Sequence, residues 1–320
     1  MTTQAGIQII AIEEHYLDED VDAKINKGAS GLVKERLLDV GAGRIAEMDA
    51  AGIDVQILSH CPPGAQCFDE SELERALAVN DKLKNTIDNY PDRFMGFASM
   101  PTKVPGACAD ELQRCVEELG FKGALTHGLT DGVFIDDERY WPMFERAQKL
   151  DVPIYVHPGP PHPAVIEAYY KDYVERWPSI LSAGWGFTVE TATAGLRLML
   201  SGVFDKFPDL KIILGHMGEG LPFLLWRVDF SFSKGFRPDA PNARIREIFT
   251  NNFWVTTSGN FSSPALLCTM MEMGIDRILF SVDWPYVENK PGPEWMEGAP
   301  LSQKDKIKVL NGNAKKLLRL

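Results

Sequence analysis

Residues 211–220 read Lys-Ile-Ile-Leu-Gly-His-Met-Gly-Glu-Gly. A short apolar run that stops at a glycine is typical of a strand buried on both faces, as in a parallel sheet covered by helices. We therefore predict a strand over Ile212–His216. This pattern places a histidine where the strand ends, followed by a glycine-rich turn that contains an acid.

The same pattern recurs along the 320-residue chain, with amphipathic segments between the apolar runs. The predicted strands are Ile7–Glu13, Val55–Ser59, Phe94–Ala98, Gly123–Thr126, Ile154–His157, Ile212–His216, Trp254–Thr257 and Ile278–Val282. The predicted helices include Arg44–Ala51, Ser71–Tyr90, Gly106–Leu119, Tyr140–Leu150, Ala192–Phe204 and a final helix, Gln303–Leu318. Eight such repeats favour an α/β fold of the (β/α)8 TIM barrel type over an open sheet, although periodicity alone does not prove closure.

Two long segments, Pro158–Gly186 and Val287–Pro300, interrupt the regular alternation. We interpret them as elaborated loops on the C-terminal face of the barrel, where this fold builds its active sites. The chain has no low-complexity segment, internal repeat or Gly/Ser linker. A single barrel domain over residues 1–320 is therefore the simplest prediction.

The composition excludes several classes of function. A net charge of -12 argues against nucleic acid or an anionic membrane as a partner, because both need clustered Lys and Arg. No apolar run approaches the roughly 18 residues of a membrane span. The polar N-terminus lacks a signal-peptide pattern, and the five scattered cysteines indicate reduced thiols. We therefore expect a cytoplasmic protein.

Candidate metal ligands follow the predicted strands. His15 follows the first strand, His157 ends the fifth, and Asp283 follows the eighth. Glu13 lies two residues before His15, so both side chains leave an extended chain on the same side, and Glu14 points the other way. Two carboxylates and two imidazoles suit one divalent metal, with an open position for water or substrate. A single histidine at a strand end is more often a satisfied polar group, but several strand ends agree here.

His216 and Glu219 form a second candidate pair. If a helix begins there, Glu219 lies in its first turn and can hold the imidazole of His216. Alternatively, Glu219 is only an acid that favours the start of a helix. His216 itself could be a metal ligand or an acid/base group behind the ligands, and the sequence leaves both open. His60, after the second strand, could contact substrate.

Several motifs carry a resemblance to a known family. They include Glu13-Glu14-His15, His157-Pro158, Gly215-His216-Met217-Gly218-Glu219 and Ser281-Val282-Asp283-Trp284-Pro285. The chain resembles the amidohydrolase superfamily from about Ile10 to Leu320. It is most similar to the decarboxylase branch, which contains γ-resorcylate, 2,3-dihydroxybenzoate and 5-carboxyvanillate decarboxylases and, more distantly, aminocarboxymuconate-semialdehyde decarboxylase.

The resemblance implies specific roles for residues of this chain. It implies that one divalent metal ion (Zn, Mn or Mg) is held by Glu13, His15, His157 and Asp283, with no organic cofactor. Behind these ligands, His216 and Glu219 would assist catalysis. Phe187 would lie near the substrate ring, and Arg227 would reach the site of a neighbouring subunit in a homodimer or homotetramer. For Arg227 alone, a surface ion pair is an equally good interpretation.

Two departures from the family pattern affect the expected substrate pocket. Gly159-Pro160-Pro161 follows the fifth strand where relatives often have Arg-Asn, and His127 stands where relatives often have Asn. We expect His127 to contact the substrate.

The resemblance implies a small aromatic carboxylate as substrate and a reversible, non-oxidative decarboxylation of ortho-hydroxybenzoic acids. Asp283 would pass a proton to the ring carbon. Two alternatives remain: a metal-dependent hydrolase of the lactonase or amidase kind on the same barrel, and a barrel without activity that serves as a binding protein.

Overall fold

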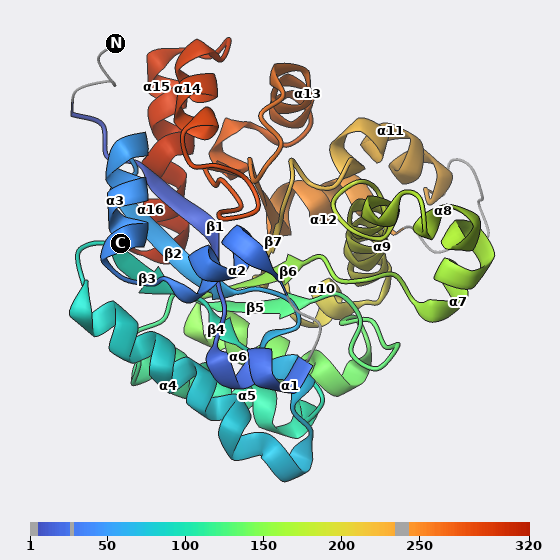
Figure 1. The fold of residues 1–320 in the computed structure, drawn as a ribbon. Helices are drawn as coiled ribbons and strands as arrows, with labels where there is room; N and C mark the ends of the chain where they lie inside the picture. Colours follow the sequence, from blue (N-terminus) through green and yellow to red (C-terminus); the bar gives the residue numbers. More distant parts are fainter. Residues whose placement is uncertain (1–5, 26–28, 234–242) are drawn as a thin grey trace.

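The computed structural model describes residues 6–25, 29–233 and 243–320. Its strands run parallel and are surrounded by helices (Figure 1). The strands are β1 (Ile10–Tyr16), β2 (Val55–His60), β3 (Phe94–Gly96), β4 (Ala98–Ser99), β5 (Ala124–His127), β6 (Pro153–His157), β7 (Lys211–Leu214), β8 (Phe253–Thr256) and β9 (Ile278–Leu279). Their burial explains why the sequence shows apolar runs and not an alternating pattern.

The strands pair in the order β1-β2-β3 and β4-β5-β6-β7-β8-β9. Between β3 and β4 the chain continues through Phe97, whose N–H donates to the carbonyl of Leu58 at 2.9 Å. On the other side, the N–H of Ile12 donates to Phe280 O at 3.3 Å and the N–H of Asp283 donates to Glu13 O at 3.1 Å. Backbone bonds therefore connect the two sets of strands on both sides, and the predicted TIM barrel is confirmed.

The larger helices cover the outside of the barrel. They are α3 (Ala42–Ala51), α4 (Leu73–Asn89), α5 (Pro105–Glu117), α6 (Trp141–Leu150), α9 (Gly186–Leu200), α12 (Ile245–Asn252) and α13 (Ser263–Met273). Local sequence starts several of them, as in α13, where the hydroxyl of Ser262 accepts from the N–H of Ala265 and Pro264 occupies the first turn. Among the described residues, no helix is long and apolar enough to cross a membrane.

The interior of the barrel is filled by side chains from alternate strand positions, among them Ile10, Ile12, Ile57, Leu125, Tyr155, Ile213 and Leu279. Leu317 and Leu318 of α16 (Asn313–Leu318) join this cluster. Since the interior is packed, chemistry is confined to the C-terminal ends of the strands.

Several predicted boundaries were wrong. The first strand runs to Tyr16, so Glu13 and His15 lie inside β1. The third predicted strand is divided at Phe97, and the sixth and eighth are shorter, ending at Leu214 and Leu279. At the barrel mouth, neighbouring loops bury polar residues as well as apolar ones. The hydropathy of the sequence therefore does not show at which residue the hydrogen bonds between strands end.

Some predicted helices and loops also differ. The helix expected over Ala192–Phe204 begins earlier as α9 and is followed by a separate α10 (Val203–Lys206). The final helix is divided by a π-helical turn at Lys308–Gly312 into α15 (Gln303–Ile307) and α16. The two long segments are partly helical: they contain α7 (Pro163–Val165), a π-helical turn (Ile166–Tyr170), α8 (Lys171–Val174), a 3-10 turn (Pro178–Leu181) and α14 (Pro291–Gly298).

Candidate metal centre

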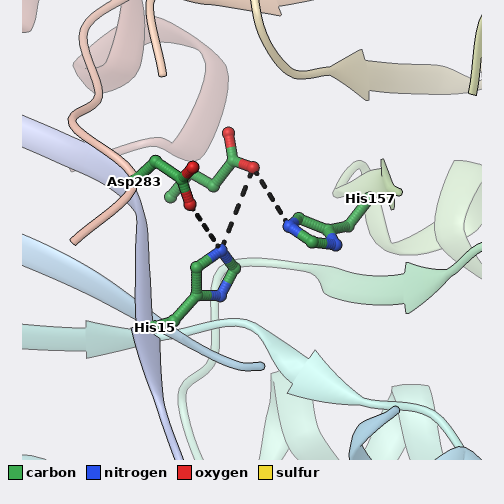
Figure 2. Close-up of side chains that lie close together, drawn as sticks. His15, His157 and Asp283 are labelled. Carbon is green, nitrogen blue, oxygen red and sulfur yellow. Dashed lines mark ion pairs between the residues drawn. The ribbon is translucent and has the colours of Figure 1, made fainter. Parts of the chain in front are cut away.

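Four potential ligands meet at the C-terminal end of the barrel. One ligand atom from each of Glu13, His15, His157 and Asp283 lies within 4.8 Å of the others. His157 Nε2 lies 3.3 Å from Glu13 Oε1, and His15 Nε2 lies 3.2 Å from Asp283 Oδ1 (Figure 2). The chain brings these groups together from β1, β6 and the segment after β9.

The four groups fit a divalent cation. Glu13 Oε1 and His15 Nε2 are buried and have no hydrogen-bond partner among the described residues, which is costly for polar atoms unless an ion completes them. Two carboxylate oxygens with two imidazole nitrogens match the preferences of Mn²⁺ and Zn²⁺.

The two carboxylates have opposite electrostatic environments. Burial raises the pKa of Glu13, and the neighbouring Asp283 adds to this, while His216 and His15 oppose it. For Asp283, burial also raises the pKa, but the neighbouring imidazoles of His15 and His216 outweigh it and hold the pKa below its usual range. Asp283 is therefore the more readily ionised carboxylate of the centre.

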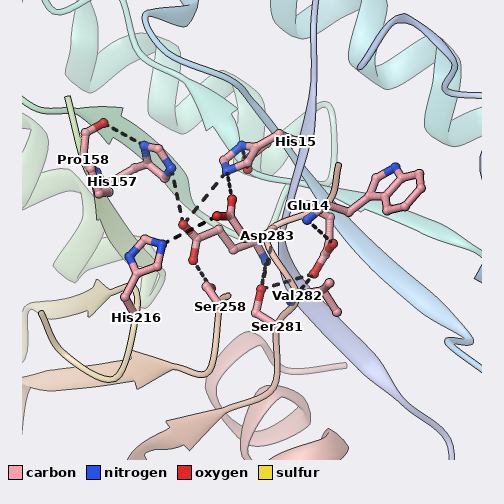
Figure 3. A network of polar contacts seen from close by, with 12 residues as sticks. Glu14, His15, His157, Pro158, His216, Ser258, Ser281, Val282 and Asp283 are labelled. Atoms are coloured by element: carbon pink, nitrogen blue, oxygen red, sulfur yellow. Dashed lines mark hydrogen bonds and ion pairs between the residues drawn. The ribbon is translucent and has the colours of Figure 1, made fainter. Parts of the chain in front are cut away.

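The second carboxylate oxygen of Glu13 is held by hydroxyl groups. Glu13 Oε2 accepts hydrogen bonds from Tyr155, Ser258 and Thr256, the last at 3.2 Å. Because Oε2 is occupied in this way, only Oε1 faces the other ligands. Ser258, whose hydroxyl makes one of these hydrogen bonds, is labelled in Figure 3.

Hydrogen bonds also orient the imidazoles. The Nδ1–H of His157 donates to the carbonyl of Pro158 at 2.8 Å, which leaves the lone pair of Nε2 for the centre. His15 Nδ1 lies 3.3 Å from the hydroxyl of Ser59. Partners of this kind fix the ring and tautomer of metal-binding histidines.

His216 lies behind the four ligands, and Glu219 holds it. Its Nδ1 is 2.7 Å from Glu219 Oε1, and its Nε2 is 3.7 Å from Asp283 Oδ2. Desolvation lowers the pKa of His216, but the charges of Glu219, Glu13 and Asp283 together raise it well above the usual value.

The expected position of Glu219 in a helix was wrong. Helix α11 (Leu221–Ser231) begins two residues later, and Glu219 has a left-handed φ of 55°. The glycine-rich turn allows the chain to reverse there and returns the carboxylate to His216.

The remaining predicted residues lie at different depths. His127 is buried, and its Nδ1 is 3.1 Å from His157 Nδ1, so it lies beside a candidate ligand. Phe187 is half-buried in the first turn of α9, and Arg227 is exposed on α11. Among the described residues, no hydrogen bond or ion pair joins Phe187 or Arg227 to the four ligands.

His60 has a structural environment. Its Nδ1 donates to Cys61 O at 2.6 Å and its Nε2 accepts from the N–H of Asp18 at 2.9 Å, so both ring nitrogens are occupied by backbone. Burial lowers the pKa of His60 to about 4.

Sequence reasoning missed the hydroxyl groups around Glu13. Tyr155 lies two residues before His157, and Thr256 lies two residues before Ser258, so each pair shares one face of an extended chain. This period of two, applied backwards from the histidine, could have identified Tyr155. Nothing local connects Thr256 or Ser258 to Glu13, 243 and 245 positions away.

The fold and the ligand cluster define the class of protein. The sequence model of the Amidohydrolase family matches residues 33–320, and the chain belongs to this family.

Within the family, many of the similar proteins are decarboxylases, as the motifs predicted. A gamma-resorcylate decarboxylase of Polaromonas sp. (strain JS666) is 40% identical over 97% of this chain and 98% of its own. A crystal structure of 2,6-dihydroxybenzoate decarboxylase complexed with 2,6-dihydroxybenzoate is 37% identical, with a TM-score of 0.88, covering 98% of this chain and 99% of that one. A Polaromonas dihydroxybenzoic acid decarboxylase with bound manganese and the inhibitor 2-nitroresorcinol is 39% identical, with a TM-score of 0.88 and coverage of 98% and 97%.

Proposed function

We propose that this protein is a metal-dependent, non-oxidative decarboxylase of ortho-hydroxybenzoic acids of the γ-resorcylate type. The observation that carries the proposal is the cluster of Glu13, His15, His157 and Asp283, in a chain that matches γ-resorcylate decarboxylases over nearly its whole length. The same site would carboxylate phenols at the ortho position at high bicarbonate concentration.

A divalent ion held by these four residues would supply positive charge that orients the substrate carboxylate and its ortho oxygen. We infer that manganese fills this role, because the Polaromonas relative contains it. Zinc and magnesium are the alternatives, which metal analysis of the purified protein distinguishes. No organic cofactor is needed for the reaction.

Asp283 is our candidate for the proton transfer. Its Oδ2 lies 3.7 Å from His216 Nε2, so its carboxylate can receive a proton from His216 and pass it to the ring carbon that bears the carboxyl group. The bond from that carbon to the carboxyl group then breaks, its electron pair returns to the ring, and carbon dioxide leaves. His216, held by Glu219, would assist the ring hydroxyl.

The substrate is expected to lie among Phe187, Arg227 and the ligands, with His127 behind His157. Arg227 would stabilise the anionic substrate by charge-assisted hydrogen bonds.

Since Arg227 is exposed on α11, this role requires a neighbouring subunit, and we infer a homodimer or homotetramer. The apolar side chains exposed on and directly after the same helix, Phe223, Leu224, Trp226, Phe230 and Phe232, support an interface there. The cytoplasmic location stays a prediction.

The decisive experiment is turnover by the Mn²⁺-loaded protein. We expect 2,6-dihydroxybenzoate to yield resorcinol and carbon dioxide. Chromatography measures the resorcinol formed, and 2,3-dihydroxybenzoate and salicylate are tested as alternative substrates. A parallel set of esters and lactones tests the hydrolase alternative, because the same metal site could activate water. Hydrolysis without decarboxylation would contradict the proposal, and a stoichiometrically loaded protein inert toward every compound would favour a binding protein.

A further inference from the structure

Glu14 is a fully buried carboxylate that points away from the metal centre (Figure 3). Its Oε1 accepts from the N–H of Val282 at 2.8 Å and from the hydroxyl of Ser281 at 3.2 Å, and its Oε2 accepts from the N–H of Trp284 at 3.2 Å. One side chain of β1 therefore binds the loop after β9 at several points.

The two backbone amides bound by Glu14 flank Asp283. The N–H of Asp283 itself donates to the carbonyl of Glu13 at 3.1 Å. Three consecutive amides of the loop are thus fixed to two consecutive residues of β1. Asp283 has a left-handed φ of 74°, a conformation that residues other than glycine rarely adopt. These hydrogen bonds therefore hold Asp283 in a conformation that the local sequence alone would not favour.

On its other side, Glu14 is held by a buried polar network. Gln56 donates from Nε2 to Glu14 Oε2 at 3.4 Å, and Arg44 donates from Nε to Gln56 Oε1 at 2.7 Å. Arg44 also donates from a guanidinium nitrogen to the carbonyl of His15 at 2.6 Å. We call Glu14, Gln56 and Arg44 the rear network. It connects the backbone of one candidate ligand, His15, to the loop that carries another, Asp283.

We propose that Glu14 is a positioning residue that sets the direction of the Asp283 carboxylate through the backbone amides of Val282 and Trp284. Arg44 and Gln56 hold Glu14 in place for this task. The inference rests on the proposed function for its catalytic consequence, but its effect on the metal site is independent of any substrate.

The test replaces Glu14 by Gln in the full-length protein. A glutamine keeps the size of the side chain but places an NH2 group against one of the two loop amides, so Asp283 loses one of its supports. We expect Mn²⁺ affinity, measured by titration with electron paramagnetic resonance, to fall by about 10- to 100-fold. With 2,6-dihydroxybenzoate and saturating Mn²⁺, kcat should fall by a similar factor while KM changes less than about 3-fold.

Glu111→Gln is the matched control. Glu111 is also a buried carboxylate with several donors, Asn80 and Arg114 among them, but it lies on α5. We expect Glu111→Gln to lower the melting temperature and to leave Mn²⁺ affinity and kcat unchanged. If Glu14→Gln does not fold, Gln56→Met, which removes the weaker bond to Glu14, should shift both quantities in the same direction by a smaller factor.

The outcomes separate the two proposals. Native Mn²⁺ affinity and native kcat in a folded Glu14→Gln, or in Gln56→Met where Glu14→Gln is unfolded, overturn the positioning role. The positioning role is also overturned if Glu111→Gln weakens Mn²⁺ binding as much as Glu14→Gln does. A native protein that binds Mn²⁺ but decarboxylates nothing overturns only the proposed function, since the affinity comparison still decides the role of Glu14. A native protein that binds none of Mn²⁺, Zn²⁺ and Mg²⁺ overturns both.

Discussion

Asp283 has a backbone conformation that costs roughly 1–2 kcal/mol for an L-residue, and its side chain lies between two histidines. This combination of backbone strain and proximity to a proton donor, His216, is typical of a residue that takes part in the chemistry. A carboxylate can carry a proton to carbon, whereas an amide of the same shape cannot.

We therefore expect Asp283→Asn to reduce kcat by at least about 1000-fold, since a proton carrier cannot be replaced by an amide. An amide oxygen can still face a cation, so the variant should retain more than half of its Mn²⁺ by metal analysis and an unchanged circular dichroism spectrum. An Asn variant with appreciable turnover would remove Asp283 from the proton transfer.

His60 leads to a prediction about pH and stability. Its pKa is about 4 in the folded protein because burial disfavours the cation, against 6.5 when exposed. The unfolded chain therefore binds a proton first as the pH falls below 6.5, and the folded state loses stability down to pH 4. The loss amounts to about 3 kcal/mol.

The measurement is the free energy of unfolding of the metal-free protein by urea between pH 7 and pH 4. In His60→Gln the side-chain oxygen can still accept from the N–H of Asp18. The free energy of unfolding of this variant should fall less steeply with decreasing pH, by the slope that the uptake of about one proton contributes. The hydrogen bond from the backbone N–H of Asp18 to the side chain at position 60 affects the absolute stability, but only the slopes are compared. Equal slopes for native and variant protein would show that His60 is not the group responsible.

At the level of single elements, α11 presents the clearest anomaly. Trp226 is 64% exposed and Phe223 is 82% exposed, and Phe230 and Phe232, on and directly after the same helix, are exposed as well. Trp226 stacks on Phe230 with a ring separation of 5.3 Å. A rigid aromatic face of this kind, beside Arg227, is typical of an interface between proteins.

We expect Trp226→Glu to shift the assembly toward smaller species in size-exclusion chromatography with light scattering. A buried charge in an apolar interface is strongly unfavourable. Ile307→Glu, at an exposed apolar position of α15, is the control and should leave the mass unchanged. A monomeric native protein would refute the interface on α11.

Arg227→Ala tests the substrate contribution of the same helix. Removal of a charge-assisted hydrogen bond to an anion should raise KM by about 10-fold or more, with a smaller change in kcat. The measurement is steady-state kinetics with 2,6-dihydroxybenzoate at saturating Mn²⁺. Unchanged kinetics would place Arg227 outside the site.

At the scale of the whole molecule, the candidate metal centre joins distant parts of the chain, since the four candidate ligands come from β1, β6 and the segment after β9. An ion bound there should stabilise the closed barrel as well as support turnover. At a free Mn²⁺ concentration of 100 Kd, linkage contributes about 2.7 kcal/mol to the free energy of unfolding. Chelation should therefore abolish activity and lower the melting temperature by several degrees.

Calorimetry of the native protein with and without Mn²⁺ measures this shift. Glu13→Ala removes one ligand and should show little dependence on Mn²⁺, which separates binding at this centre from binding to surface carboxylates. A shift of equal size in Glu13→Ala would place the stabilising ion elsewhere.

The sequence by itself determined the order of strands and helices, because apolar runs and helical periodicity are local properties of the chain. It also determined the four candidate ligands, since parallel strands in a barrel must bring their C-terminal ends to one rim. Tertiary structure alone decided where β1 ends, that His60 is satisfied by backbone, and that Thr256 and Ser258 hold Glu13. It likewise decided that Glu14 supports Asp283. These contacts join residues far apart in the chain, and no local pattern records which distant hydrogen-bond partners meet once the strands close into a ring.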